Sequence, residues 1–504
     1  MTSSPLAPAP SPAAPVGRVS LQFALLIFCL AIVAQWLVYS QSFAIKPASD
    51  DWPIINEIHR GNLQGVGVFF TDSVIQIGYR PLKSLTIWWF GNLDPNHRVE
   101  WVRVLHLLGG MLFAFAGMLW LRELPIGKVA FIAGMLLVTL HPVLPQCLGS
   151  IDGIDTAASS GFLWLGAWCL YRFRGRPIPA LVTSLICFFI GVGFKENLFA
   201  LAPLAMVIVV MFWPRDRIKR DAAIVALAYA LAFLSMVLIR RIVIRGGLSS
   251  GYNMIRFDPI TLAKNAATFA TGLLFFGDSL WVYIHQSAAV LALVGASCLA
   301  AFGLIVAGLW LRVRDNSESA KRWIIFFLIG GCAASFPTIL LFHVSEMYVP
   351  PMLVPFAMLC VLAIDGWLRF GSRPMKIIVA AVCALALVTS IATIRDKIAG
   401  LARVGERADV QFKAMLDHIP PGTKDKKILL LFYPSELGPR ATYSVFMIAD
   451  AILLGQPVTP EYYRPGDNLR VESITAPEPE QYDQAGWDYV LLWDARSATF
   501  RSLK

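Results

Sequence analysis

The sequence predicts an all-α polytopic membrane protein with about eleven transmembrane helices and a small C-terminal extracytoplasmic α/β domain. Of its 504 residues, 57% are hydrophobic and only 15% are charged, whereas soluble domains carry about 25% charged residues. Apolar runs recur along the chain, and a run of ~20 helical residues crosses a hydrocarbon core of ~30 Å. These runs lack the alternation of apolar and polar residues that membrane barrel strands show, so they predict helices.

The first apolar segment follows a tail rich in proline and alanine (1–18), which we expect to be disordered. This segment is longer than the apolar part of a usual signal peptide and many more follow, so we interpret it as an uncleaved anchor. The predicted spans are 21–39, 101–121, 129–144, 156–171, 178–194, 198–213, 222–239, 288–311, 323–342, 350–368 and 377–394.

Basic residues in the short connections indicate the orientation. If the N-terminus is cytoplasmic, Arg and Lys are concentrated in the cytoplasmic connections. The short outer connections contain no Arg and only one Lys, which is Lys195. This asymmetry predicts a multi-pass plasma membrane protein, in the inner membrane if the host is a bacterium, with its site in the periplasm. The formal charge of +10 is then explained by topology and lipid headgroups, and we expect no nucleic acid partner.

Two long connections, 40–100 and 240–287, lie on the outer side in this topology. Each contains an apolar stretch too short to span, 82–90 and 268–283, which predicts a helix in the interface. Beyond residue 394 the chain turns polar, and KILLLFYP (427–434) and DYVLLWD (488–494) predict buried strands around a helix near 441–454. We therefore expect a membrane module (19–394) followed by an α/β domain (395–504).

The eight cysteines all fall in or at the ends of apolar segments. They predict neither a disulfide framework nor a cysteine metal site. Two adjacent carboxylates, Asp50 and Asp51, could bind a metal ion, but the chemistry inferred below requires none, and we expect neither a metal nor a cofactor.

Asp50 and Asp51, in the stretch ASDDWP, open the first long outer connection. One interpretation is a solvated or helix-capping pair. The other is a general base, because partial burial and a like-charged neighbour raise the pKa of a carboxylate towards working pH. The sequence leaves these two interpretations equally weighted.

Other charged residues occur in separate outer connections. Asp152 and Asp155 lie in the glycine-containing turn GSIDGID, Lys195 and Glu196 lie in GFKEN, and Glu346 lies in HVSEMY. A simple interfacial ion pair explains Lys195 and Glu196 equally well. We nevertheless expect charged groups from four connections to converge on one site.

The second long connection carries basic residues on the side where positive charge is disfavoured. Long loops are partly exempt from the charge rule, which is the simpler explanation. Guanidinium groups bind phosphate in a bidentate manner, so we predict a clamp for an anionic lipid headgroup. The basic residues of this connection are Arg240, Arg241, Arg245, Arg256 and Lys264.

A set of short motifs appears in order within the first two hundred residues. They are DDWPIIN (50–56), YRPLKSLT (79–86), His97, His106, the pair His141 and Pro142, GSIDGIDTAA (149–158) and KEN (195–197). This pattern resembles membrane glycosyltransferases of the GT-C fold that use polyprenyl-phosphate-linked sugars. It is most similar to the first half of TPR-containing dolichyl-phosphate-mannose protein O-mannosyltransferases.

The resemblance implies a role for each matched residue. Asp50 would be the catalytic base with Asp51 as its neighbour, and Asp155 would orient the acceptor. We assign donor and phosphate binding to Arg80, Lys195, Glu196, Arg240, Arg241 and Arg245. Acceptor or supporting roles go to Asp152, His141, Glu346 and Tyr348. The chain departs from the family in having Met347 at an arginine position and in lacking TPR repeats.

The expected function is inverting transfer of a sugar from a polyprenyl-phosphate donor to an extracytoplasmic hydroxyl of a glycan, lipid or protein. Membrane lipids are the other expected partners. The alternative from another class is a transporter or lipid flippase, in which intramembrane charges would mark a translocation path. The charges lie mostly at the outer ends of spans, which argues against this, and an inactive scaffold is a third reading.

Overall fold

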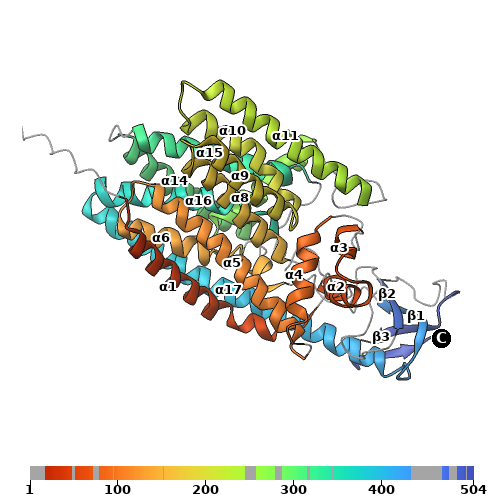
Figure 1. Ribbon diagram of the computed structural model, residues 1–504. Helices are drawn as coiled ribbons and strands as arrows, with labels where there is room; N and C mark the ends of the chain where they lie inside the picture. The colour runs from red at the N-terminus through yellow and green to blue at the C-terminus, as the bar shows by residue number, and fades with distance from the viewer. Residues whose placement is uncertain are drawn as a thin grey trace, which may run out of the picture.

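The computed structural model describes residues 18–47, 51–71, 79–94, 96–150, 153–243, 257–278, 287–314, 318–341, 346–432, 468–475, 485–494 and 496–504. This part of the chain is mostly helical, with a small sheet near the C-terminus at one end of a long helix bundle (Figure 1). The expected N-terminal tail lies almost wholly outside it.

Seven helices of the described chain are long and apolar enough to cross a membrane. They are α1 (Leu21–Tyr39) with the 3₁₀ turn η1 (Ser40–Ala44), α5 (Arg98–Glu123), α11 (Ile218–Val243), α14 (Ala288–Arg314), α15 (Glu318–Ile339), α16 (Pro350–Phe370) and α17 (Arg373–Leu416). Four more helices complete the bundle, namely α6 (Lys128–Thr139), α8 (Ile154–Arg172), α9 (Pro177–Val192) and α10 (Leu201–Phe212), the last preceded by η3 (Glu196–Ala200). Each of the eleven apolar segments therefore contains a helix, but only seven meet the length and apolarity of a full span.

Small residues let the bundle helices approach closely. Between α14 and α16, a Cβ atom added to Gly366 would lie 2.2 Å from the carbonyl oxygen of Gly308, and one added to Gly308 would lie 2.5 Å from the oxygen of Ala363. Backbone contact of this kind is typical of membrane helices, whose association depends on close packing rather than on hydrophobic burial.

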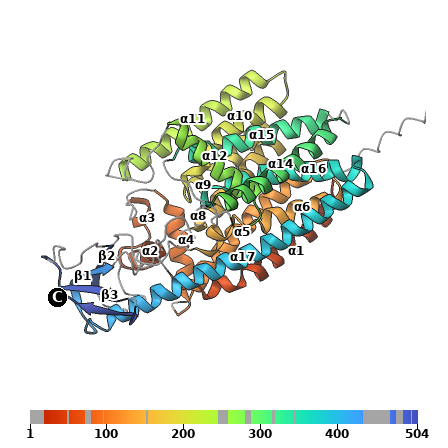
Figure 2. The ribbon, with the colours of Figure 1, turned by 180° about the vertical axis from the view of Figure 1, so that it is seen from behind.

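Short helices cover one end of the bundle. Beside the sheet lie α2 (Asp51–Gln64), α3 (Val68–Thr71) and α4 (Pro81–Gly91), and the expected helix at 82–90 is α4 (Figure 1). The others are α7 (Pro145–Gly149), α12 (Pro259–Leu274) beside α14 (Figure 2), and η5 (Glu346–Tyr348).

The helix α12 begins at Pro259, nine residues before the predicted stretch at 268–283. The carboxylate of Asp258 accepts a hydrogen bond of 2.8 Å from the amide of Thr261, and proline is favoured at the first helical position. The cap therefore makes the helix begin earlier in the chain than predicted. Part of the predicted stretch, 279–283, lies outside the described residues.

The C-terminal sheet has four strands in the order β2-β1-β3-β4. They are β1 (Lys424–Phe432), β2 (Asn468–Thr475), β3 (Tyr489–Asp494) and β4 (Thr499–Ser502). β1 pairs in parallel with β2 and β3, and β4 is antiparallel to β3. The two predicted strands are the central ones, which have continuous apolar runs. The edge strands β2 and β4 have no such run and escaped prediction, and the helix expected near 441–454 lies outside the described chain.

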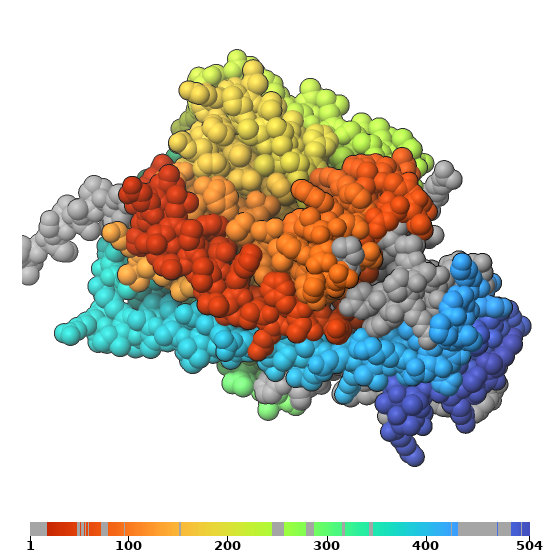
Figure 3. Space-filling model, turned by 60° about the horizontal axis from the view of Figure 1, so that its bottom comes forward, coloured from red at the N-terminus to blue at the C-terminus, as the bar shows by residue number. Residues whose placement is uncertain are grey.

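Helix α17 continues well past residue 394, where the sequence predicts the end of a span and of the membrane module. The polar stretch after Ile394 keeps a helical period, with Ile398, Ala408, Phe412 and Met415 buried on one face. Figure 3 shows α17 running along one side of the molecule, from the bundle to the sheet at the far end. The two expected parts of the chain are therefore joined by one continuous helix.

The sheet packs on α2, α4 and the end of α17. Trp493 and Phe500 of the strands share a buried apolar cluster with Phe412 of α17, Ile55 of α2 and Ile87 of α4. The sheet thus contacts the helix that begins at Asp51.

Candidate functional site

Asp155, in the first turn of α8, is fully buried and faces three cations. Its Oδ2 atom lies 2.6 Å from Nη1 of Arg80 and 3.2 Å from Nζ of Lys83. Its Oδ1 atom lies 3.2 Å from Nζ of Lys195. A buried carboxylate needs such partners to offset its desolvation, so this contact set fixes two other chain segments, the start of α4 and the segment of Lys195, relative to α8.

Glu196 extends the same network. Arg80 Nη2 lies 3.1 Å from its Oε2 atom, and Arg240 Nη1 lies 3.0 Å from its Oε1 atom. Burial raises the pKa of the Glu196 carboxyl, but Arg80 and Arg240 outweigh this and hold it below its usual value. Counting only described residues, four cations face two carboxylates. We call this group the Asp155 cluster: Arg80, Lys83, Asp155, Lys195, Glu196 and Arg240.

Lys195 makes two further contacts within this cluster. It donates a 2.6 Å hydrogen bond to Oγ1 of Thr156 and lies 5.2 Å from the ring centroid of Tyr348. The structure thus brings together residues of four connections that the sequence predicts to lie on one side of the membrane: Arg80, Asp155, the Lys195–Glu196 pair and Tyr348.

Arg240 reaches the cluster from α11. The sequence places Arg240 and Arg241 at the start of a loop, whereas both belong to the last turn of α11, which ends at Val243. Arg240 is partly buried and pairs with Glu196, whereas Arg241 is exposed. Arg245 lies outside the described residues. Of the predicted clamp, the described contacts therefore join only Arg240 to the cluster.

Lys83 belongs to the cluster although the sequence reasoning did not select it. It lies three residues after Arg80, at the start of α4, and is almost completely buried. Residues three apart share one face of a helix. The available signal was a lone lysine at this spacing in an otherwise apolar helix.

Asp51 is buried at the start of α2, where its Oδ1 atom accepts a 3.3 Å hydrogen bond from Oγ of Ser150. Ser150 belongs to the turn that leads into α8 and Asp155. Asp50 and Asp152 lie outside the described residues. The structure therefore places Asp51 against the segment that carries Asp155.

Arg103 ties the same two segments together from α5. Its buried guanidinium donates a 2.8 Å hydrogen bond to the carbonyl oxygen of Ile45, which precedes Asp51 in the chain. It donates a second hydrogen bond to the carbonyl oxygen of Gly149. Both acceptors are main-chain groups, so Arg103 fixes backbone position.

Gly153 closes the turn before Asp155. A Cβ atom there would lie 2.3 Å from the carbonyl oxygen of Gln146 and 2.6 Å from Cα of Cys147. We expect Gly153→Ala to lower the free energy of unfolding by about 1–3 kcal/mol, because the backbone must move to admit the methyl group. Gly175→Ala is the matched control, since nothing lies within 4 Å of its added Cβ. Thermal unfolding in detergent measures both, and equal midpoints would contradict the steric argument.

Glu346 joins a different group. Its Oε2 atom lies 2.6 Å from Nζ of Lys397 on α17. The same Nζ atom lies 3.5 Å from Oδ1 of Asp278 and donates a 3.0 Å hydrogen bond to the carbonyl oxygen of Pro142. Burial raises the pKa of Glu346, and Lys397 opposes this shift without cancelling it. We call Asp278, Glu346 and Lys397 the Lys397 cluster. The sequence did not point to Lys397, because its position falls just beyond the last predicted span, in the part assigned to the C-terminal α/β domain.

His141 lies in apolar surroundings. Its Nε2 atom is 3.1 Å from the carbonyl oxygen of Leu273, and its ring centroid lies 5.3 Å from that of Phe276. These contacts join the α6–α7 connection to the end of α12. Among the described residues, the hydrogen bonds and ring contacts of His141 include no member of the Asp155 cluster.

Met347, at the position where the resembled family has arginine, is linked through its main chain. Its amide donates a 3.0 Å hydrogen bond to Oε1 of Gln146. The turn η5 thereby holds Glu346 towards the Lys397 cluster and Tyr348 towards Lys195.

Within the described residues, no group of three or more His, Cys, Asp or Glu side chains is arranged to hold a metal ion. Comparison of the chain with protein-family models and with curated protein sequences finds no match. The site must therefore be interpreted from its own geometry.

Proposed function

We propose that this protein is a GT-C-like membrane glycosyltransferase that moves a sugar from a polyprenyl-phosphate donor to an acceptor hydroxyl. The observation that supports this proposal most is the Asp155 cluster, where four cations meet two carboxylates in one partly buried place. An excess of positive charge suits a phosphate group. The motif resemblance supports the sugar and the lipid carrier.

The proposed chemistry is a single displacement. Asp50 takes the proton of the acceptor hydroxyl as its oxygen attacks the anomeric carbon, and the bond from that carbon to the phosphate oxygen breaks. The configuration at the anomeric carbon inverts. The phosphate diester leaves as a monoester that gains negative charge, so nearby cations such as Arg80 and Arg240 bind it more strongly as the reaction proceeds, which is the requirement for catalysis.

The proposed topology has eleven spans, counting the shorter helices of the bundle, in the inner membrane of a bacterial host. The cytoplasmic N-terminus follows from the distribution of Arg and Lys. The Asp155 cluster, α2 and the C-terminal sheet then face the periplasm. We expect a reporter fused after Lys504 to report a periplasmic location and one inserted at Gly371 a cytoplasmic one. A cytoplasmic signal at Lys504 would reverse the assignment of the site as well.

The function is tested by following sugar transfer from a polyprenyl-phosphate donor in purified membranes. Arg240 and Arg241 form a matched pair, because only Arg240 contacts Glu196. We expect Arg240→Gln to raise the KM for the lipid-linked donor roughly tenfold, since a charge-assisted contact to phosphate contributes about 1.5–3 kcal/mol. Arg241→Gln should leave this KM nearly unchanged.

Two outcomes would count against the proposal. Absence of transfer with every polyprenyl-phosphate sugar offered would favour a transporter or an inactive scaffold. Equal effects of Arg240→Gln and Arg241→Gln would remove the Glu196-paired arginine from donor binding while leaving the transferase assignment open to the Asp50 test described below.

A further inference from the structure

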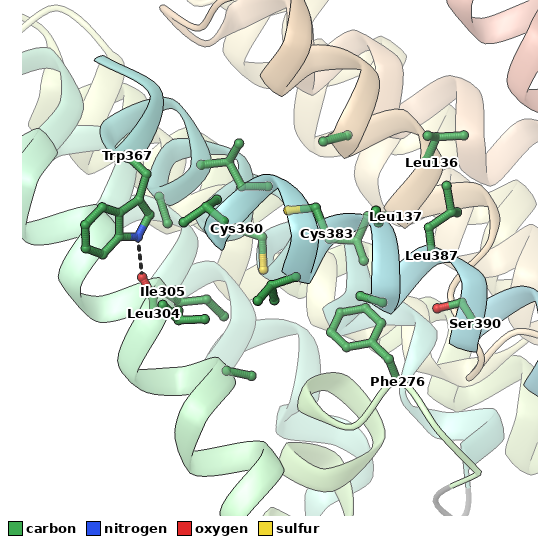
Figure 4. A pocket seen from close by; sticks show the side chains of 18 of the residues that line it. Leu136, Leu137, Phe276, Leu304, Ile305, Cys360, Trp367, Cys383, Leu387 and Ser390 are labelled. Atoms are coloured by element: carbon green, nitrogen blue, oxygen red, sulfur yellow. Dashed lines mark hydrogen bonds between the residues drawn. The ribbon is translucent and has the colours of Figure 1, made fainter. Parts of the chain in front are cut away.

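A cavity of about 340 Å³ lies between four helices of the bundle, within the ~300–1,000 Å³ range of ligand sites. Its walls include Leu136 of α6, Leu304 of α14, Cys360 of α16 and Leu387 of α17, which gather around it in Figure 4. None of the residues that line it belongs to the Asp155 cluster. It is therefore a separate feature of the bundle.

The cavity is unsuited to water. Apart from two thiols, the polar side chains among its described lining residues are Ser390 and Trp367. The indole nitrogen of Trp367 already donates a 2.9 Å hydrogen bond to the carbonyl oxygen of Leu304. A buried water needs two to four polar partners, and apolar cavities bind apolar ligands instead. Protein interiors are close-packed and seldom leave a space of this size empty. With its apolar walls, this space fits a hydrocarbon chain.

The cavity reaches the surface of the bundle. Val129 and Val382 line it and yet are 64% and 41% exposed. Lys128 directly precedes Val129, and Lys376 lies one turn before the lining residue Val379. A chain entering here would leave its headgroup beside basic side chains.

We propose that this cavity binds one acyl chain of an anionic phospholipid, whose phosphate is held by Lys128, Arg373 and Lys376. Arg373 and Lys376 lie in the first turn of α17, exposed and partly exposed respectively. A cationic rim beside an apolar cavity favours an anionic over a zwitterionic lipid. The inference concerns the end of the bundle away from the sheet and does not depend on the proposed transferase activity.

The test strips the purified full-length protein of lipid in detergent and reloads it with phosphatidylglycerol or phosphatidylcholine. Native mass spectrometry then counts the retained lipid. We expect about one phosphatidylglycerol per chain and far less phosphatidylcholine, and we expect Arg373→Gln with Lys376→Gln to weaken retention of phosphatidylglycerol roughly tenfold or more.

A second variant fills the cavity itself. Ala386 lines it, whereas Ala381 lies on the same helix, is exposed, and does not line it. Ala386→Phe is expected to abolish retention and Ala381→Phe to preserve it. Retention by Ala386→Phe, or equal retention of the two lipids by the unaltered protein, would overturn the proposal. If Ala386→Phe does not fold, an unchanged preference for phosphatidylglycerol in the surface double variant overturns it.

Discussion

Replacement of Asp50 by Asn is expected to lower the turnover of sugar transfer by roughly 10²- to 10⁴-fold, the usual contribution of a general base. The amide keeps the shape of the side chain and most of its hydrogen-bonding capacity but cannot accept the proton. Donor binding should persist, because the donor phosphate is assigned to the Asp155 cluster. Single-turnover kinetics with a polyprenyl-phosphate sugar measures the chemical step separately from binding.

Asp51→Asn is the control for this experiment. Asp51 is buried and held by Ser150, so we expect it to support its neighbour and its loss to cost less turnover. Collapse of turnover in Asp51→Asn with near-normal turnover in Asp50→Asn would exchange the two roles. If both variants kept their turnover per folded molecule and lost only about 1 kcal/mol of stability, the pair would be a helix cap.

Replacement of Asp155 by Asn is expected to have the largest effect on stability. It leaves Arg80, Lys83 and Lys195 facing one another without their shared carboxylate. Removing one partner of a buried ion pair costs about 3–5 kcal/mol, because the remaining charges are left uncompensated. Thermal unfolding in detergent measures this loss. Turnover of the folded fraction should fall between the values for the Asp50 and Asp51 variants, since Asp155 is proposed to orient the acceptor.

A double-mutant cycle separates charge from packing. Lys83→Met removes one of the three cations and keeps an apolar stem of similar length, so Asp155→Asn combined with Lys83→Met should be less destabilised than the sum of the single variants. Additive losses would mean that Asp155 acts through packing rather than through its charge.

The bundle was predictable because apolar length is a local property of the sequence. All eleven apolar segments contain helices, and the convergence of Arg80, Asp155, Lys195 and Glu196 followed from assigning their connections to one side of the membrane. The predicted topology indicated that these residues lie on the same side, but it did not indicate which of them form ion pairs with one another.

Pairing depends on contacts that no local pattern reveals. Glu346 was expected beside the other outer charges, yet it binds Lys397, which comes from a helix that the sequence appeared to end at residue 394. Polar composition was taken for the end of α17, although its apolar residues kept a helical period. Lys83 was missed because its one local signal, a lone lysine in an apolar helix three residues after Arg80, does not identify its carboxylate partner.

The length of α17 connects the site to the membrane itself. With 44 residues and a rise of ~1.5 Å per residue, this helix is about 66 Å long, more than twice a hydrocarbon core of ~30 Å. Spanning helices change their tilt when bilayer thickness changes. Because α17 is continuous, a change in its tilt would move Lys397 and the sheet together. The sheet in turn packs against α2. We therefore expect the geometry around Asp51 to depend on the acyl-chain length of the surrounding lipids.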